Sequence, residues 1–420
     1  MSRTRWIRAI GLALIIAGAA CAAPAPSASP PSESADPSGT GPVRPTSPPP
    51  SISPAPSASE SARPGLGAEL DVIALDHERS GTIDVFASTG NAIIFSAAIL
   101  PDAGPDTAPD LWRIRPEISP EPELVWQNPN RDHALVSIVG DLDTYAFVDM
   151  PVDGTRAWDL WVVPRDGEPV LLDSHPGDDD VPDLVPSIAV YEPSIVWTAF
   201  DRGPSGPVSQ LLTASAPDWQ PRLLAERLAA EAELWLPALA GGTLAYTEVV
   251  YSADRSTDER HLYLGSTTDV ADAVRLDTSG LATMAVITDD EVLWKEADPG
   301  FSMFNWGRMW RYDLATERVS MLDTTPQEYV NYPSGDGRWL AWWGAVSSVL
   351  GVYDLGHDEP RVIERYPADG NEFIMRPHVA GDLIAWMYVV QDASGATTGE
   401  LRYAWLPNWL DFRQESRGGD

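Results

Sequence analysis

Residues 332–342 read YPSGDGRWLAW and place the tight-turn dipeptide Asp336-Gly337 before a short apolar strand that contains Trp342. From residue 70 onward the same unit recurs. It has an apolar strand with an aromatic residue, a variable loop, and a second strand with a leucine–aromatic pair. The aromatic residues of the first strands are Phe95, Phe147, Trp197, Tyr246, Trp294, Trp342 and Trp386, separated by 52, 50, 49, 48, 48 and 44 residues. This regular spacing predicts a repeat architecture built from one supersecondary unit.

The short runs have the composition of strands. They are rich in Val, Ile, Leu and aromatic residues and are bounded by Gly, Pro or Asp, which favours strand over helix. Examples are DLWVV in the second strand and ELVWQ in a third. Turn dipeptides such as Gly140-Asp141 and Gly381-Asp382 join antiparallel strands and imply a further strand upstream. One stretch, residues 225–236 (AERLAAEAELWL), is predicted to be a short loop helix instead.

Four antiparallel strands repeated about every 40–50 residues predict the blades of a β-propeller. The fold class is therefore all-β, with about seven four-stranded blades over residues 66–410. Six or eight blades also fit the pattern, because the two ends of this region are its least regular parts. We expect the ring to close by pairing residues 70–74 or 83–87 with the last blade, since an open edge invites aggregation.

The unit at 332–342, with a proline shortly before an Asp-Gly turn and an aromatic strand, resembles the repeats of TolB-type and WD-repeat-like propellers. The resemblance covers this unit well, whereas the other units keep only the strand pattern. It implies the propeller fold. The region also resembles the non-catalytic half of some peptidases, and residues 411–420 are predicted to form only a C-terminal tail.

The N-terminus is predicted to be a signal peptide, residues 1–20. Arg3, Arg5 and Arg8 precede an uncharged run at 9–20, and this run is shorter than the roughly 20 residues that span a bilayer. The run ends in Gly18-Ala19-Ala20-Cys21, which resembles the lipobox of bacterial lipoproteins, although Gly18 stands where that family usually has Leu. The resemblance implies that Cys21 carries a lipid and anchors an exported protein to a membrane of the cell envelope.

Residues 21–65 are rich in Pro, Ser and Ala and contain almost no bulky aliphatic residues. Such a segment buries too little apolar surface to fold, so it is predicted to be a disordered tether between the anchor and the propeller.

Charge and composition exclude several functions. The 62 acidic and 28 basic residues give a net charge of −34, which argues against a nucleic-acid partner. The single Cys excludes an internal disulfide, and the single Lys, Lys295, follows Trp294 and so cannot belong to a phosphate-binding loop. Cations, sugars and basic proteins remain as partners.

Candidate ligand-binding residues lie in the long loops, which are predicted to emerge on one face of the propeller. Phe301, Phe304 and Trp306, next to Arg308, can stack on a sugar or hold a peptide; alternatively, they pack inward. A second candidate is an acidic run of possible Ca²⁺ ligands: Asp178, Asp179, Asp180 and Asp183. It lacks the alternating spacing of a dedicated calcium loop, so a solvated turn is the alternative. No other cofactor is predicted.

Two functions are compatible with these features. The first is a non-catalytic binding or scaffold module for an envelope protein, a peptide or a glycan. The second is a hydrolase or lyase that acts on polysaccharide with carboxylates at the channel mouth. The six His show no metal-ligand spacing, and the sequence has no Gly-x-Ser-x-Gly motif. Converging carboxylates with shifted pKa values at the channel mouth would favour the enzyme, and an apolar or aromatic patch there would favour the binding module.

Overall fold

The computed structural model describes residues 73–75, 83–97, 109–130, 132–152, 155–165, 167–177, 184–254, 257–277, 279–297, 307–324, 330–344, 349–365, 371–392 and 397–406. These residues form the 28 strands β1–β28. The predicted signal peptide, Cys21, the tether and the tail lie outside them. Within these ranges, no helix is long and apolar enough to cross a membrane.

The strands fall into consecutive groups of four, which we number as blades. Blades 1 to 3 are β2 (Ile83–Ser88), β3 (Ile93–Ala97), β4 (Asp110–Arg115), β5 (Ser119–Trp126); β6 (His133–Asp141), β7 (Thr144–Pro151), β8 (Trp158–Val163), β9 (Val170–His175); and β10 (Ile188–Tyr191), β11 (Ser194–Gly203), β12 (Gly206–Ser215), β13 (Arg222–Leu228). Blades 4 and 5 are β14 (Ala232–Ala240), β15 (Thr243–Tyr251), β16 (Asp258–Ser266), β17 (Val274–Arg275); and β18 (Ala282–Ile287), β19 (Glu291–Ala297), β20 (Gly307–Asp313), β21 (Arg318–Met321). Blades 6 and 7 are β22 (Val330–Asp336), β23 (Trp339–Gly344), β24 (Val349–Asp354), β25 (Glu359–Arg365); and β26 (Glu372–Ala380), β27 (Leu383–Gln391), β28 (Thr397–Trp405), β1 (Ile73–Ala74).

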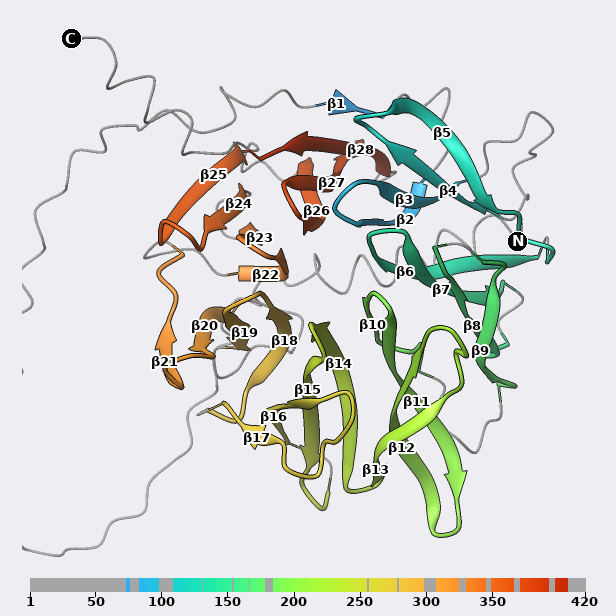
Figure 1. The fold of residues 1–420 in the computed structure, drawn as a ribbon, viewed down its shortest axis with the longest axis vertical. Helices are drawn as coiled ribbons and strands as arrows, with labels where there is room; N and C mark the ends of the chain where they lie inside the picture. The colour runs from blue at the N-terminus through green and yellow to red at the C-terminus, as the bar shows by residue number, and fades with distance from the viewer. Residues whose placement is uncertain are drawn as a thin grey trace, which may run out of the picture.

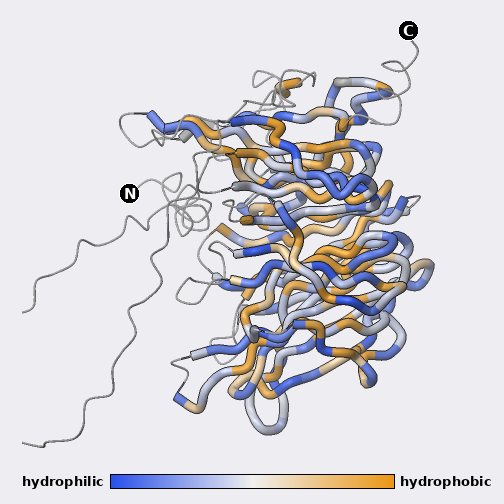
Figure 2. Tube along the Cα trace, turned by 90° about the vertical axis from the view of Figure 1, so that its left-hand side faces the viewer, coloured by the Kyte–Doolittle hydropathy of each residue, from blue (hydrophilic) through white to orange (hydrophobic). Residues whose placement is uncertain are grey.

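The seven blades of the described chain are arranged in a ring around a central channel (Figure 1), so the β-propeller prediction is confirmed. Within each blade the strands are antiparallel, and in blades 1 to 6 they follow chain order from the channel outward. A bridge between Gly307 and Val330 joins the sheets of blades 5 and 6. Seen from the side, apolar segments follow the strands through the disc (Figure 2).

Ring closure uses the first of the two predicted segments. Ile73 pairs with Tyr403 and Ala74 with Arg402, so β1 becomes the outer strand of blade 7. The second segment forms β2, the innermost strand of blade 1. The two ends of the folded chain therefore meet in one sheet, in which β1 covers the outer edge of β28 and completes a fourth strand of blade 7.

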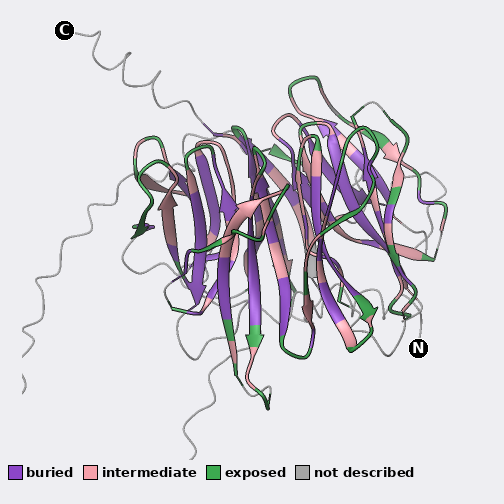
Figure 3. Cartoon of the chain, turned by 60° about the horizontal axis from the view of Figure 1, so that its bottom comes forward, coloured by how far each residue is buried: buried purple, intermediate pink, exposed green. Residues whose placement is uncertain are grey.

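The core is divided among the gaps between blades. The aromatic residues that define the repeat, Phe95, Phe147, Trp197, Tyr246, Trp294, Trp342 and Trp386, are at most 2% exposed. Each belongs to a different apolar cluster, and each cluster joins two neighbouring blades; Trp294 of blade 5, for example, packs with Ala245 and Leu262 of blade 4. Figure 3 shows the buried strands side by side. A buried aromatic side chain of this kind typically buries 150–250 Å², and the need for one in each gap explains why every repeat has an aromatic residue in its first strand.

The innermost strands of blades 4 to 7 share a β-bulge. The pairing register shifts at the same place in β14, β18, β22 and β26. The bulged residues Leu236, Met284, Tyr332 and Arg376 have φ angles of 46–53°. A bulge of this kind bends the strand and redirects the side chains that follow it. In blades 6 and 7 these are Ser334 and His378, which line the channel.

The prediction of a short helix at residues 225–236 is wrong. These residues lie in β13 and β14, which are joined by a turn in which the Glu231 amide donates to the Leu228 carbonyl. The run is rich in the helix formers Ala, Glu and Leu, but intrinsic propensity is a weak preference. Pairing of β13 with β12 and of β14 with β15 outweighs it.

Candidate functional site

Each blade contributes the last residue of its innermost strand to one end of the central channel. In the described chain these residues are Ser88, Asp141, Tyr191, Ala240, Ile287, Asp336 and Ala380. All seven line a cavity of about 190 Å³, together with residues one to three positions earlier in the same strands. The cavity opens at the end of the channel where short turns connect the first and second strands. We call this ring of seven residues the channel mouth.

Asp141 is one of two charged residues of the channel mouth. It ends β6, and its Oδ2 accepts a hydrogen bond of 2.8 Å from the backbone amide of Glu192 in blade 3. Burial raises the pKa of Asp141, and the negative charges of Asp336 and Glu192 raise it further, whereas the Glu192 amide and Arg165 oppose the rise. The carboxylate therefore links two blades and also presents its charge to the cavity.

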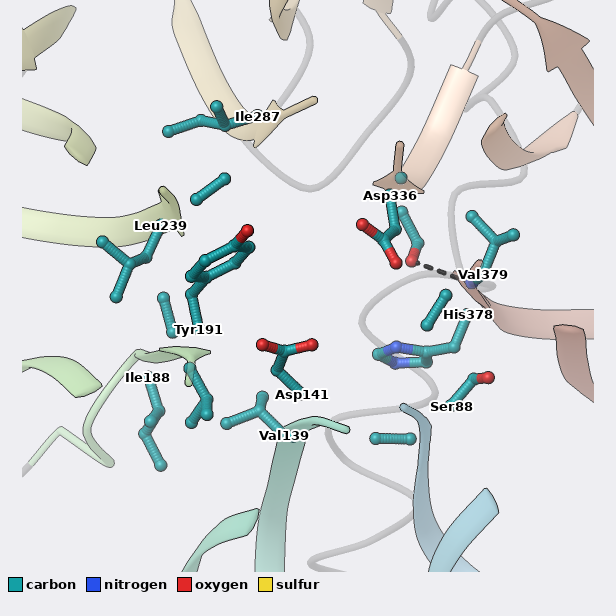
Figure 4. A pocket seen from close by; sticks show the side chains of 18 residues that line it. Ser88, Val139, Asp141, Ile188, Tyr191, Leu239, Ile287, Asp336, His378 and Val379 are labelled. Carbon is teal, nitrogen blue, oxygen red and sulfur yellow. Dashed lines mark hydrogen bonds between the residues drawn. The ribbon is translucent and has the colours of Figure 1, made fainter. Parts of the chain in front are cut away.

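Asp336 repeats this arrangement on the other side of the ring. It ends β22 in blade 6, and its Oδ2 accepts a hydrogen bond of 2.7 Å from the backbone amide of Gly381 in blade 7. In a ring of seven, blades 2 and 6 are separated by three blades in one direction and two in the other, so the two aspartates approach from well-separated sides. Figure 4 shows both carboxylates directed into the space between the inner strands.

His378 and Tyr191 complete the polar lining. The His378 imidazole points into the cavity (Figure 4) and contacts the Phe86 ring edge-on, at a centroid distance of 5.5 Å. Enclosure by the surrounding strands lowers the pKa of His378 to about 4, and the charge of Arg376 acts in the same direction. The imidazole is therefore neutral at pH 7. Tyr191 extends from the end of β10 with its ring facing the same space.

Ser334 and Ser88 fix the strands that hold these groups. The Ser334 hydroxyl accepts a hydrogen bond of 3.1 Å from the Val379 amide. The Ser88 hydroxyl donates to the Leu383 carbonyl at 3.2 Å. These contacts link blade 6 to blade 7 and blade 7 to blade 1, so the neighbours of His378 are held on both sides.

The residues that the sequence predicted as ligand-binding are not part of this cavity. Arg308, at the start of β20, is exposed, and its guanidinium lies 3.9 Å from the Met321 sulfur. Phe301, Phe304 and Trp306, and the calcium candidates Asp178, Asp179, Asp180 and Asp183, lie outside the described residues. The cavity lies at the end of the channel where the first strand of each blade ends, and the second strands, after which the long loops were predicted, end on the other face. One of those loops, expected at 201–207, is largely a strand extension, in which Asp201 pairs with Val208.

The sequence identified Asp141 and Asp336 only as parts of turn dipeptides. Nothing in the local pattern distinguished them from the acids of other turns, because their convergence depends on closure of the ring. The arrangement provides two carboxylates, a neutral imidazole and a phenol around a small space. Among the described residues, no group of three or more His, Cys, Asp or Glu side chains is placed to hold a metal ion.

Comparisons with known proteins give the fold. No family model matches the chain, and no curated protein matches it in sequence. The β-propeller domain of the trilobed protease from Pyrococcus furiosus is similar, with a TM-score of 0.52 and 10% identity over 79% of this chain and 97% of that one. A prolyl endopeptidase structure has a TM-score of 0.51 and 12% identity over 78% of this chain and 48% of that one, so the match spans about half of the peptidase. At this identity the likeness shows one thing, that the chain folds as a β-propeller.

Proposed function

We propose that this protein is an exported, lipid-anchored propeller that binds a partner of the cell envelope at its channel mouth without catalysis. The observation that carries the proposal is the 190 Å³ cavity, to which all seven inner strands contribute. Drug-sized ligands occupy pockets of about 300–1,000 Å³. This cavity is smaller and suits one projecting group, such as a side chain of a protein or peptide, better than a polysaccharide chain.

The edge of the mouth supports a polypeptide partner. Leu142, next to Asp141, is 42% exposed, and Tyr191 is 37% exposed. An apolar side chain and an aromatic ring beside a polar cavity resemble the anchor residues of protein interfaces, where Tyr is enriched. A partner that inserts one group into the cavity would also cover these two side chains.

Site-specific photocrosslinking in cells tests this proposal. A benzoylphenylalanine at position 142 is expected to yield adducts with a partner, whereas the same group at Leu223, on outer strand β13 and 47% exposed, yields none. A third position, Arg308, reports on the long-loop face. Adducts at 308 but not at 142 would move the binding site to that face and contradict the proposal.

The anchor is proposed from the sequence of residues 1–21 and is tested separately. Cys21→Ser is expected to release the protein from the membrane fraction, because only the lipidated thiol holds it there. The intact mass of the membrane-extracted wild type should include the lipid. An unmodified Cys21, or a variant that stays on the membrane, would contradict the anchor and leave the binding proposal intact.

One observation favours the second candidate, a polysaccharide hydrolase or lyase. Two carboxylates converge at the mouth, and the pKa of Asp141 is raised, as a general acid requires. Each carboxylate is also a hydrogen-bond acceptor for the next blade, which accounts for its position without catalysis. Release of reducing ends or unsaturated products from envelope polysaccharides, abolished by Asp141→Asn, would establish the enzyme instead.

A further inference from the structure

We infer that the channel mouth recognises a positively charged nitrogen group, an ammonium or guanidinium, on its partner. The inference rests on the proposed function and specifies the chemistry of the group that enters the cavity. It follows from two carboxylates that face the cavity and, within the described chain, form no salt bridge, from a partly buried imidazole directed into the cavity, and from an aromatic ring on its wall.

The first step concerns the carboxylate oxygens. Asp141 and Asp336 each use Oδ2 for the amide of the next blade. Within the described chain, no hydrogen bond reaches Oδ1 of either residue, and neither forms a salt bridge. The mouth therefore presents two negative charges, each with acceptor capacity left, and an N–H donor with a positive charge is the complementary group.

The second step concerns the nearby basic residues. Arg165 lies near Asp141 but is bound to Glu192 at 3.3 Å and to Asp143 at 3.6 Å. Arg338, two residues after Asp336, is bound to Asp354. Arg376 lies on the same strand as His378, two residues earlier, and is not among the residues that line the cavity. Arg165 therefore compensates the charge of Asp141 only in part, and within the described chain no arginine or lysine forms a salt bridge with either carboxylate of the mouth.

The third step concerns the other polar groups. The His378 imidazole is partly buried, points into the cavity and has no hydrogen-bond partner among the described residues. A ring nitrogen of the neutral form can accept a hydrogen bond from an ammonium. The Tyr191 ring adds an aromatic face, which attracts cations. The lining thus offers acceptors and a π-face but no fixed positive charge.

The shape and the overall field agree with this chemistry. Between the polar groups the wall is apolar, with Val139, Ile188, Leu239 and Ile287, and can hold the aliphatic stem of a lysine or arginine. A protein of net charge −34 attracts cations from a distance. The same chemistry is present in a basic side chain and in a free small amine, so the experiment must distinguish these two sources.

The test is isothermal titration calorimetry of the purified full chain at low salt. The probes are the peptide acetyl-Gly-Ala-Lys-Ala-Gly-amide, its norleucine analogue, n-butylamine and CaCl₂. We expect the lysine peptide to bind and the norleucine peptide to bind at least about tenfold more weakly, since a charge-assisted hydrogen bond contributes more than 1.4 kcal/mol. Tighter binding of the lysine peptide than of n-butylamine assigns the site to a polypeptide; equal binding assigns it to small amines.

The variants are Asp141→Asn with Asp336→Asn, and the control Asp289→Asn. Asparagine retains an oxygen for the inter-blade amide, so the double variant should fold. It is expected to weaken lysine-peptide binding by about tenfold or more. Asp289 is an exposed acid in the turn of blade 5 that does not line the cavity, and its variant should bind within about twofold of wild type.

Equal binding of the lysine and norleucine peptides, or an unaffected double variant, would overturn the inference. So would CaCl₂ binding at the mouth in preference to the peptide. The variant Ala240→Phe, which fills the cavity, distinguishes an error in the cation inference from an error in the proposed binding function. If Ala240→Phe removes the crosslinks from position 142 and the double aspartate variant keeps them, the mouth binds a partner through a group that is not cationic.

Discussion

Asp141 and Asp143 stand two residues apart on one hairpin of blade 2, yet their surroundings are opposite. Asp143 lies in the turn between β6 and β7 and is not part of the cavity lining. Arg115 binds it at 2.9 Å and Arg113 lies at 3.7 Å, and we call an arginine-paired acid of this kind a rim acid. Burial tends to raise the pKa of Asp143, but these arginines outweigh it and the pKa is lowered. Asp141 faces the channel and has a raised pKa. Sequence proximity therefore does not determine the role of an acid on this face.

Blade 6 shows the same contrast between mouth and rim. Asp354, at the end of β24, is 2% exposed and binds Arg338 at 2.8 Å and the His357 Nδ1 at 2.8 Å. Asp336, at the end of β22, has the Gly381 amide as its only hydrogen-bond donor among the described residues. On both blades basic residues form salt bridges with the rim acids, whereas within the described chain the acids of the mouth form none, and Arg165 acts on Asp141 only from beyond salt-bridge distance. We take the rim acids to stabilise the fold and the mouth acids to serve binding.

Removal of a rim acid should have the largest effect on stability. Asp354→Ala leaves Arg338, His357 and the Gly356 amide without their acceptor, and breaking a buried pair costs about 3–5 kcal/mol. Urea unfolding at pH 7 should show a loss in this range, with Asp289→Asn as the control. A loss no larger than that of the control would remove the distinction between rim and mouth.

Acid should destabilise the protein through His378. The pKa of His378 is about 4 in the folded state, against 6.5 for an ordinary histidine. Folding therefore favours the neutral imidazole. The resulting stability is complete above pH 6.5 and is lost as the pH falls from 6.5 to 4, by roughly 3 kcal/mol.

The variant His378→Gln has no imidazole to protonate and should lose less stability across this window. The measurement is the free energy of unfolding of both proteins between pH 7 and pH 4. Parallel curves for the two proteins would show that His378 is not held in its neutral form and would weaken its role as an acceptor at the mouth.

Removal of a mouth acid should have the smallest effect, and one of opposite sign. The raised pKa of Asp141 means that its ionised form is disfavoured in the folded state. Asp141→Asn should therefore increase stability at pH 7, by no more than about 1 kcal/mol, with the gain disappearing as the pH falls and the wild-type carboxyl protonates. A clear loss of stability at pH 7 would make Asp141 a structural acid like Asp354.

The sequence predicted the architecture well because the architecture is local and repeated. Trp294 and Trp342 each fill the gap beside their own blade. Because every blade needs such a residue at the same place, the repeat can be recognised in the sequence alone. The helix predicted for the Ala/Glu-rich segment at 225–236 is wrong because strand pairing outweighs helix propensity there.

The channel mouth could not be predicted in the same way. Asp141 and Asp336 are 195 residues apart and are brought to one cavity only by closure of the ring, and the bulge that directs His378 into the channel has no unique sequence signal. Gly140-Asp141 and Asp336-Gly337 are predicted as turns, but Gly140, Asp141 and Asp336 end the strands β6 and β22, and the turns are Leu142-Asp143 and Gly337-Arg338. The turn pattern therefore does not reveal which side chains meet at the channel.

The central claim is that the two acids of the channel mouth bind a cationic group of a partner. The most direct test is to measure the pKa of Asp141 by carboxyl ¹³C NMR, in the free protein and in the protein saturated with the lysine peptide. A cation beside the carboxylate favours its ionised form. We predict a pKa above the usual aspartate range in the free protein, a clear fall when the lysine peptide binds, and no fall with the norleucine analogue. A pKa of Asp141 that does not fall when the lysine peptide is bound would contradict the account.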